Sequence, residues 1–131
     1  MKWRVIGTGE AGDWHASLDR FSTTDVYFLP EYHRAYELNG DGEARAFIVE
    51  HGDALLFYPF MVRPIKAEGH GTPLDTWYDI ETVYGYSGPL CTTGDPSFLA
   101  GAWQVFSDWC RRERIIAEFI RFNPLIDNHH Y

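Results

Sequence analysis

The clearest hydrophobic pattern in the chain lies between residues 98 and 110. Apolar side chains recur there at intervals of three and four, which places them on one wide face of an amphipathic helix. They are Phe98, Leu99, Ala102, Trp103, Phe106, Trp109 and Cys110. Asp95 suits the N-cap of this helix, and Pro96 suits its first turn. Residues 111–114, three of them arginine, complement the negative end of the helix dipole and mark its predicted end.

Two shorter helices are predicted in the first third of the chain. Trp14, Leu18 and Phe21 are spaced as i, i+4 and i+7, which is one face of a short helix. The second helix begins at Pro30, whose fixed φ and missing N–H suit the first helical position. It ends at residues 39–40, because an Asn-Gly pair is a typical stop signal.

Apolar, β-prone stretches predict the strands. A short first strand covers residues 3–6, and residues 43–65 form a β-hairpin whose second arm is the longest apolar run in the chain. Pro59 lies within that second arm, and since proline cannot donate to a ladder, it predicts a sheet edge or a bulge. A brief strand is expected at residues 78–80 and a further strand at residues 115–122.

The element order is therefore β-α-α-β-β-β-α-β, and it predicts a mixed α/β (α+β) domain with helices flanking a central sheet. The strand–helix–strand passage at the end favours a parallel pair of strands. Residues 66–77, rich in Gly and Pro, are expected to form a loop. The last strand is expected to be a core strand interrupted by Glu118 and Arg121, which are then either paired or near its carboxyl end, where α/β sheets bind ligands.

Composition bounds the class of protein. The chain has 131 residues, 45% of them hydrophobic and 17% aromatic, which indicates one folded domain and excludes intrinsic disorder. A net charge of −8 argues against DNA or RNA binding through phosphates. No apolar stretch reaches membrane-spanning length, and the first residues do not resemble a signal peptide. Two cysteines are too few for a disulfide scaffold, so we expect a cytoplasmic, reduced domain.

The usual catalytic and metal motifs are missing. Histidines and cysteines show no metal-ligand spacing, so no metal site is expected; the histidines are His15, His33, His51, His70, His129 and His130. Cys110 falls on the apolar helix face, whereas Cys91 follows a loop and is expected to be more accessible. Ser87 lacks the spacing of a nucleophile elbow. Asp95 would occupy the helix N–H groups that could otherwise bind an anion.

The segment 79–90 is the unusual one, because glycine and tyrosine alternate in it. Glycine lets a ligand approach the backbone, and tyrosine offers a stacking face and a hydroxyl. A binding loop and a packed aromatic crossover loop are both compatible with this pattern. The Trp and Tyr excess would also suit carbohydrate stacking.

Taken together, these segments resemble the N-terminal part of the Fem-type branch of the GNAT acyltransferase superfamily. That branch includes the bacterial aminoacyltransferases that form peptidoglycan bridges. The resemblance rests on five short stretches in order: residues 25–32, 57–60 with 63–65, 78–80, 84–90 and 118–125.

The resemblance implies two GNAT-like lobes and transfer of an acyl or aminoacyl group to an amine. Residues 1–131 would form a single GNAT-like domain, incomplete by itself and the N-terminal portion of a larger two-lobed protein. Residues 92–96 do not match the family's Gly-rich pyrophosphate turn, so we expect no cofactor on this chain. Acyl-CoA or aminoacyl-tRNA would be a co-substrate of the full-length protein.

The sequence-based hypothesis is a substrate-side domain of such a transferase, inactive in isolation, with a small molecule or cell-wall precursor as substrate. Four loop residues would line the substrate groove, and two at the end of the last strand would contact a carboxylate or phosphate. These are Tyr84, Gly85, Tyr86 and Gly88, followed by Arg121 and Asn123. Catalytic residues stay unassigned, with Asp79 as the candidate general base. The alternative is a non-catalytic binding or self-association module.

Overall fold

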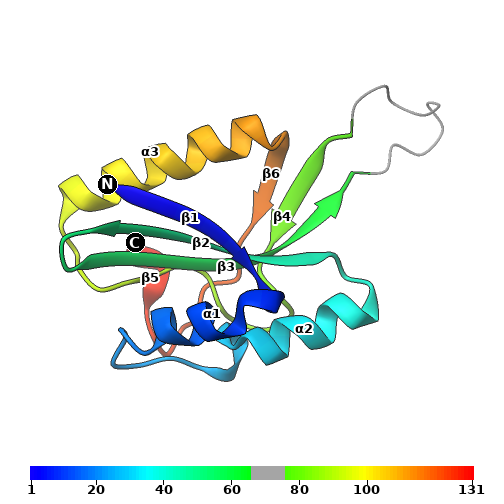
Figure 1. The fold of residues 1–131 in the computed structure, drawn as a ribbon, viewed down its shortest axis with the longest axis horizontal. Helices are drawn as coiled ribbons and strands as arrows, with labels where there is room; N and C mark the ends of the chain where they lie inside the picture. The colour runs from blue at the N-terminus through cyan, green and yellow to red at the C-terminus, as the bar shows by residue number, and fades with distance from the viewer. Residues whose placement is uncertain (66–75) are drawn as a thin grey trace.

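A six-stranded mixed sheet forms the centre of the computed structural model, which describes residues 1–65 and 76–131 (Figure 1). The strand order is β1-β2-β3-β4-β6, and the short β5 also pairs with β3. The strands are β1 (Lys2–Gly7), β2 (Glu43–His51), β3 (Ala54–Pro64), β4 (Tyr78–Glu81), β5 (Leu90–Cys91) and β6 (Ile115–Phe119). The helices are α1 (Ala11–Leu18), α2 (Pro30–Asn39) and α3 (Pro96–Arg112), with single 3₁₀ turns η1 (Thr8–Glu10), η2 (Val26–Phe28) and η3 (Asn128–His130).

Helices cover both faces of this sheet, α3 on one side and α1 with α2 on the other (Figure 1). Successive side chains of a strand point to opposite faces, so Phe47 packs with Phe106 of α3 while Ile48 joins the cluster around Trp14 of α1. The Trp14 indole donates a hydrogen bond to the Phe28 carbonyl, 2.8 Å away, which ties η2 to α1. Burial on both faces explains why the central strands are apolar without alternation.

The predicted hairpin is confirmed, with β2 and β3 paired continuously from Glu43 opposite Val62 to His51 opposite Ala54. The prediction that Pro59 marks a bulge is wrong, whereas the predicted edge is present on one side of β3 only, where residues 58–60 pair with neither β4 nor β5. β3 is an inner strand, and Pro59 lies opposite Ala46 in an unbroken register.

The missing N–H of Pro59 nevertheless has a consequence on the other side of β3. On that side, the Leu55 N–H donates to the Thr92 hydroxyl and the Ile65 N–H donates to the Trp77 carbonyl. Because backbone N–H groups point alternately to the two sides of a strand, an N–H at position 59 would face the same side. Pro59 therefore offers no donor there, and it falls in the gap between the part of β3 that pairs with β5 and the part that pairs with β4.

The predicted parallel pair is confirmed by β4 and β6, which align from Tyr78 opposite Ile115 to Glu81 opposite Phe119. The expectation that the last strand belongs to the core is wrong. β6 ends the strand order, so one side of it has no neighbouring strand among the described residues, and Ile116 and Phe119 are 61% and 54% exposed. An apolar sequence does not by itself distinguish a buried strand from an edge strand.

The helix predictions hold with adjusted bounds. α2 and α3 lie where their start and stop signals place them, and the Asp95 carboxylate caps α3 by accepting from the Ser97 N–H at 3.0 Å. α1 contains Trp14 and Leu18 of the predicted face but ends at Leu18, which leaves Phe21 beyond it. Most of the loop predicted at 66–77 lies outside the described residues. Within the described part of the chain, no helix combines the length and apolar character needed to cross a membrane.

Candidate functional site

The segment between β4 and β5, residues 82–89, leaves the edge of β3 as an excursion that we call the tyrosine loop. Cys91 follows Glu81 by ten positions, whereas their partners on β3, Leu56 and Met61, are five positions apart. The extra residues have no partners on β3, so this part of the chain leaves the sheet at the level of Pro59. The loop thus starts at the carboxyl end of β4, the end at which parallel strands of α/β sheets commonly present ligand-binding groups.

Tyrosines from η2 and α2 hold the outer side of this loop. The Tyr32 hydroxyl donates a hydrogen bond to the Tyr84 carbonyl at 2.6 Å, and the ring of Tyr36 stacks on that of Tyr84 with centroids 6.1 Å apart. Tyr27 meets both Tyr32 and Tyr86 edge-on, at 5.4 and 6.3 Å. Burial, together with the neighbouring Tyr36, raises the pKa of Tyr32 well above its usual value, so this hydroxyl stays protonated and remains a donor.

The two loop glycines are required by packing against these partners. Gly85 has φ +110°, and a Cβ there would lie 2.3 Å from Cε1 of Tyr27. Gly88 has φ +88°, and a Cβ there would lie 3.0 Å from Nδ2 of Asn128. The close approach that glycine permits is therefore to the protein's own side chains, as in a packed crossover loop. The side chains of Tyr84 and Tyr86 remain exposed beside them.

Two buried asparagines hold the inner side of the loop. Asn123 donates from Nδ2 to the Tyr86 carbonyl at 3.0 Å and to the Asp25 carboxylate at 3.2 Å. Asn128 donates from its own Nδ2 to the carbonyls of Ser87 and Pro89, at 2.6 and 2.9 Å. The amide of Asn123 is thus engaged with the protein, and it acts on the site by positioning the loop. Sequence reasoning missed Asn128, for which no periodicity or motif gives a signal.

Arg121 lies directly beyond β6, with its backbone fixed and its side chain exposed. Its N–H donates to the Thr82 hydroxyl at 3.0 Å, and its carbonyl accepts from the Ser87 N–H at 3.1 Å. Its guanidinium lies 5.2 Å from the ring centroid of Phe119 and makes no ion pair with any described residue. A cation with a fixed backbone and no carboxylate partner is suited to bind an anionic group.

Tyr84 and Arg121 line one hollow at the carboxyl ends of β4 and β6, with a volume of about 350 Å³. A second hollow of about 330 Å³ shares Asp41 and Glu81 with the first and reaches Arg63 on β3. We call these two hollows together the carboxyl-end groove. It carries a cation at Arg121 and carboxylates at Asp41 and Glu81, so it presents both signs of charge within one concave surface.

Asp79, the candidate general base, lies beside this groove and pairs with Arg63. Its carboxylate accepts two hydrogen bonds from that guanidinium, at 2.9 and 3.0 Å, and Glu81 accepts a third at 2.9 Å. Hydrogen bonding to Asp79 raises the pKa of the Arg63 guanidinium above its ordinary value. Asp79 does not line the hollow that Tyr84 and Arg121 share, and the structure brings it together with Arg63 instead.

The cysteines offer no activated nucleophile. Cys91 is buried, so the expectation that it is the more accessible thiol is wrong; β5 pairing with β3 places it in the core. Burial raises the pKa of both thiols, that of Cys110 to about 12. Neither thiol forms the reactive thiolate at neutral pH.

A hollow larger than either of the two in the carboxyl-end groove lies elsewhere, near the amino ends of β4 and β6. It measures about 580 Å³ and lies between the sheet and the end of α3. Trp3, Tyr78 and Arg112 are among its lining residues, and the Arg112 guanidinium lies 5.0 Å from the Trp3 ring. None of the site residues expected from the sequence lines it.

Comparison of the chain with protein-family models, with curated proteins and with solved structures finds no match. The functional conclusion accordingly depends on the element order, on the contacts of the tyrosine loop and on the chemistry of the carboxyl-end groove.

Proposed function

We propose that this chain is a substrate-binding domain of a Fem-type acyltransferase of the GNAT superfamily, and that the carboxyl-end groove binds the acyl acceptor. The observation that carries the proposal is a convergence in space. The five stretches on which the resemblance rests are far apart in the sequence, yet four of them contribute to the tyrosine loop, its supports or the adjoining groove, and the fifth, residues 78–80, contacts the groove through the ion pair of Asp79 with Arg63. Asp25, Asn123 and Tyr86 join three of them through the Asn123 amide.

The remaining stretches meet at the same place. Arg63 pairs with Asp79 next to the groove, and Pro59 lies opposite the point where the tyrosine loop leaves the sheet. The element order, with β4 and β6 parallel on either side of the α3 crossover, also agrees with the β-α-α-β-β-β-α-β order expected from the sequence, apart from the short additional strand β5 before α3. Contacts that depend on residues from every stretch support a shared role for them.

The groove suits an acceptor that carries both an amine and an anionic group. Arg121 can bind a carboxylate or phosphate, and the Asp41 carboxylate in the same hollow can accept from an ammonium group, whereas Glu81 is paired with Arg63. The exposed ring of Tyr84, which lines the same hollow, provides a stacking surface. A peptide precursor of the bacterial cell wall has this combination of groups.

Catalysis on this scheme requires a second lobe. Acyl transfer to an amine needs the two reactants held together and donors for the developing oxyanion, and the groove positions one of them. Asp95 occupies the N-terminus of α3, which opposes binding of a pyrophosphate there. The donor, acyl-CoA or aminoacyl-tRNA, is therefore assigned to the rest of a full-length enzyme.

Isothermal titration with a UDP-linked cell-wall peptide precursor tests the proposal. Arg121→Ala should weaken binding about tenfold or more, since a hydrogen-bonded charge contributes about 1.5–3 kcal/mol, while the melting temperature changes little. Arg111→Ala is the matched control, because it removes the same charge from an exposed position that pairs only with Asp108 among the described residues. Equal affinity of wild type and Arg121→Ala would refute the assignment.

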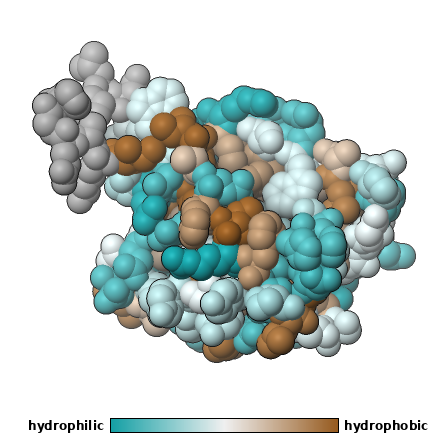
Figure 2. Space-filling model, turned by 180° about the vertical axis from the view of Figure 1, so that it is seen from behind, coloured by the Kyte–Doolittle hydropathy of each residue, from teal (hydrophilic) through white to brown (hydrophobic). Residues whose placement is uncertain are grey.

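A second candidate function, self-association, is favoured by the open side of β6. An unpaired strand edge can add a strand from another chain, and Ile116 and Phe119 expose apolar side chains there. Figure 2 shows apolar patches of limited size among hydrophilic side chains on one face of the molecule. Light scattering should then report a dimer that Phe119→Lys converts to a monomer; a wild-type monomer at high concentration would contradict this candidate.

A further inference from the structure

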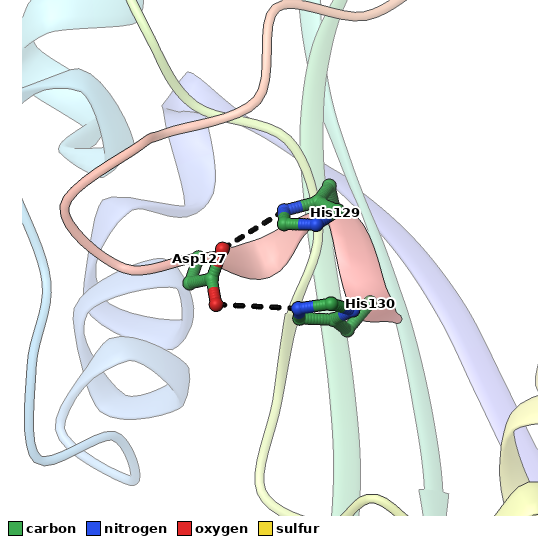
Figure 3. Close-up of side chains that lie close together, drawn as sticks. All are labelled: Asp127, His129 and His130. Atoms are coloured by element: carbon green, nitrogen blue, oxygen red, sulfur yellow. Dashed lines mark ion pairs between the residues drawn. The ribbon is translucent and has the colours of Figure 1, made fainter.

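Three polar side chains next to η3 converge outside the site described above. The Nδ1 atom of His129 lies 3.0 Å from Oδ1 of Asp127, and the Nε2 atom of His130 lies 3.2 Å from Oδ2 of the same carboxylate. Figure 3 shows both imidazoles turned toward Asp127, and their ring centroids are 3.9 Å apart. One ligand atom from each residue can be chosen so that all three lie within 4.8 Å of one another.

These separations are close to those of a metal-bound ligand set. Ligand atoms about 2.0–2.1 Å from a tetrahedral ion lie about 3.3 Å from one another. Each imidazole nitrogen is near this distance from its own Asp127 oxygen, with which it now forms an ion pair, and three ligand atoms with a single carboxylate oxygen lie within 4.8 Å, so small side-chain rotations bring them around one ion. Two imidazoles and one carboxylate suit zinc and the neighbouring divalent transition ions better than calcium or magnesium, which prefer oxygen ligands alone. All three side chains are exposed, so further coordination positions would be open to water or to a ligand.

The backbone that carries these side chains is fixed by the fold. Asn128 stands between the ligands in sequence and is fully buried, where it donates to the Ser87 and Pro89 carbonyls and accepts from the Asn123 N–H at 2.8 Å. The ligand residues on either side of it are thus presented on a turn anchored to the tyrosine loop. An anchored turn lowers the ordering cost of binding an ion.

We propose that Asp127, His129 and His130 form a binding site for a divalent transition ion of the zinc type. No metal is expected here from the sequence, because an Asp-x-His-His spacing matches none of the usual motifs. The turn at η3 is what brings the three groups together. The inference is independent of the acyl-acceptor proposal, since none of these residues lines the carboxyl-end groove.

Zinc titration of the full chain after removal of metals with a chelator tests the site. The wild type should bind one zinc ion by calorimetry, and His129→Ala/His130→Ala should weaken binding by more than about tenfold or abolish it. The control His15→Ala/His51→Ala removes two solvent-accessible histidines elsewhere and should bind as the wild type does. Melting curves without zinc verify that both double variants fold.

Two results would overturn this inference. The wild type could bind no zinc, or the two double variants could lose affinity equally, which would indicate diffuse binding by surface histidines. Asp127→Asn provides an independent measurement, because it replaces the carboxylate by a neutral side chain of the same size while both histidines stay in place. Undiminished affinity in Asp127→Asn would remove the carboxylate from the ligand set.

Discussion

The substitution Gly85→Ala tests why glycine stands at the centre of the tyrosine loop. The backbone at Gly85 has φ +110°, which costs an L-residue about 1–3 kcal/mol. The added Cβ would also lie 2.3 Å from Cε1 of Tyr27, so the ring must move at a further cost of about 1–3 kcal/mol. Since a ring at the surface can yield in part, we expect a total loss of about 3 kcal/mol in the free energy of unfolding.

Urea denaturation and thermal melting measure this loss. For a chain of this length, about 3 kcal/mol corresponds to a fall of about 10 °C in Tm. Gly94→Ala is the matched control, because Gly94 has no positive φ and no atom lies within 4 Å of the Cβ that alanine would add there, so its variant should stay within about 0.5 kcal/mol of wild type. Equal stability of the two variants would refute the packing role that the structure gives to Gly85.

Three further changes test other parts of the fold. Burial lowers the pKa of His33 from 6.5 to about 4, so the wild type should lose about 3 kcal/mol as pH falls from 6.5 to 4, and His33→Gln should show a flatter stability–pH curve by calorimetry. Burial raises the pKa of the Glu118 carboxyl, which accepts a hydrogen bond from the Tyr58 hydroxyl. The free energy of unfolding should therefore fall as pH rises through this raised pKa, and urea titrations of Glu118→Gln should show no such fall. Asp95→Ala removes the cap of α3 and should cost about 1 kcal/mol by urea titration, whereas an unchanged midpoint would contradict the capping role.

Local signals in the sequence predicted most of the framework. The start and end of α3 follow from Asp95, the apolar stripe and the arginines, because capping and periodicity act within a few residues of the chain. The β2–β3 hairpin and the parallel β4–β6 pair follow from apolar runs and element order. The edge position of β6 could not be predicted, since it depends on which strands find partners.

The candidate site depends on pairs that sequence spacing does not reveal. Tyr32 and Tyr84 are 52 residues apart, and Asn123 and Asp25 are 98 residues apart, yet each pair is hydrogen-bonded. The pattern identified Tyr84 and Arg121, which the fold places in one hollow, but not the supporting tyrosines or Asn128. From the sequence, the tyrosine loop could be either a binding loop or a packed crossover loop. The contacts of Gly85 and Gly88 show that its backbone is packed against the protein, while the side chains of Tyr84 and Tyr86 are exposed and accessible to a ligand.

Ligand binding at the carboxyl-end groove is the central claim, and a thermal-shift titration tests it most directly. The ligands are a UDP-linked cell-wall peptide precursor, acetyl-CoA and a simple sugar, each added to wild type and to Arg121→Ala. The account predicts that the precursor alone raises the wild-type midpoint, by about 2.7 kcal/mol of stabilisation at a hundredfold excess over Kd, and that Arg121→Ala reduces the shift. A cooperative wild-type melt that no ligand shifts, or a shift that Arg121→Ala leaves unchanged, would contradict it.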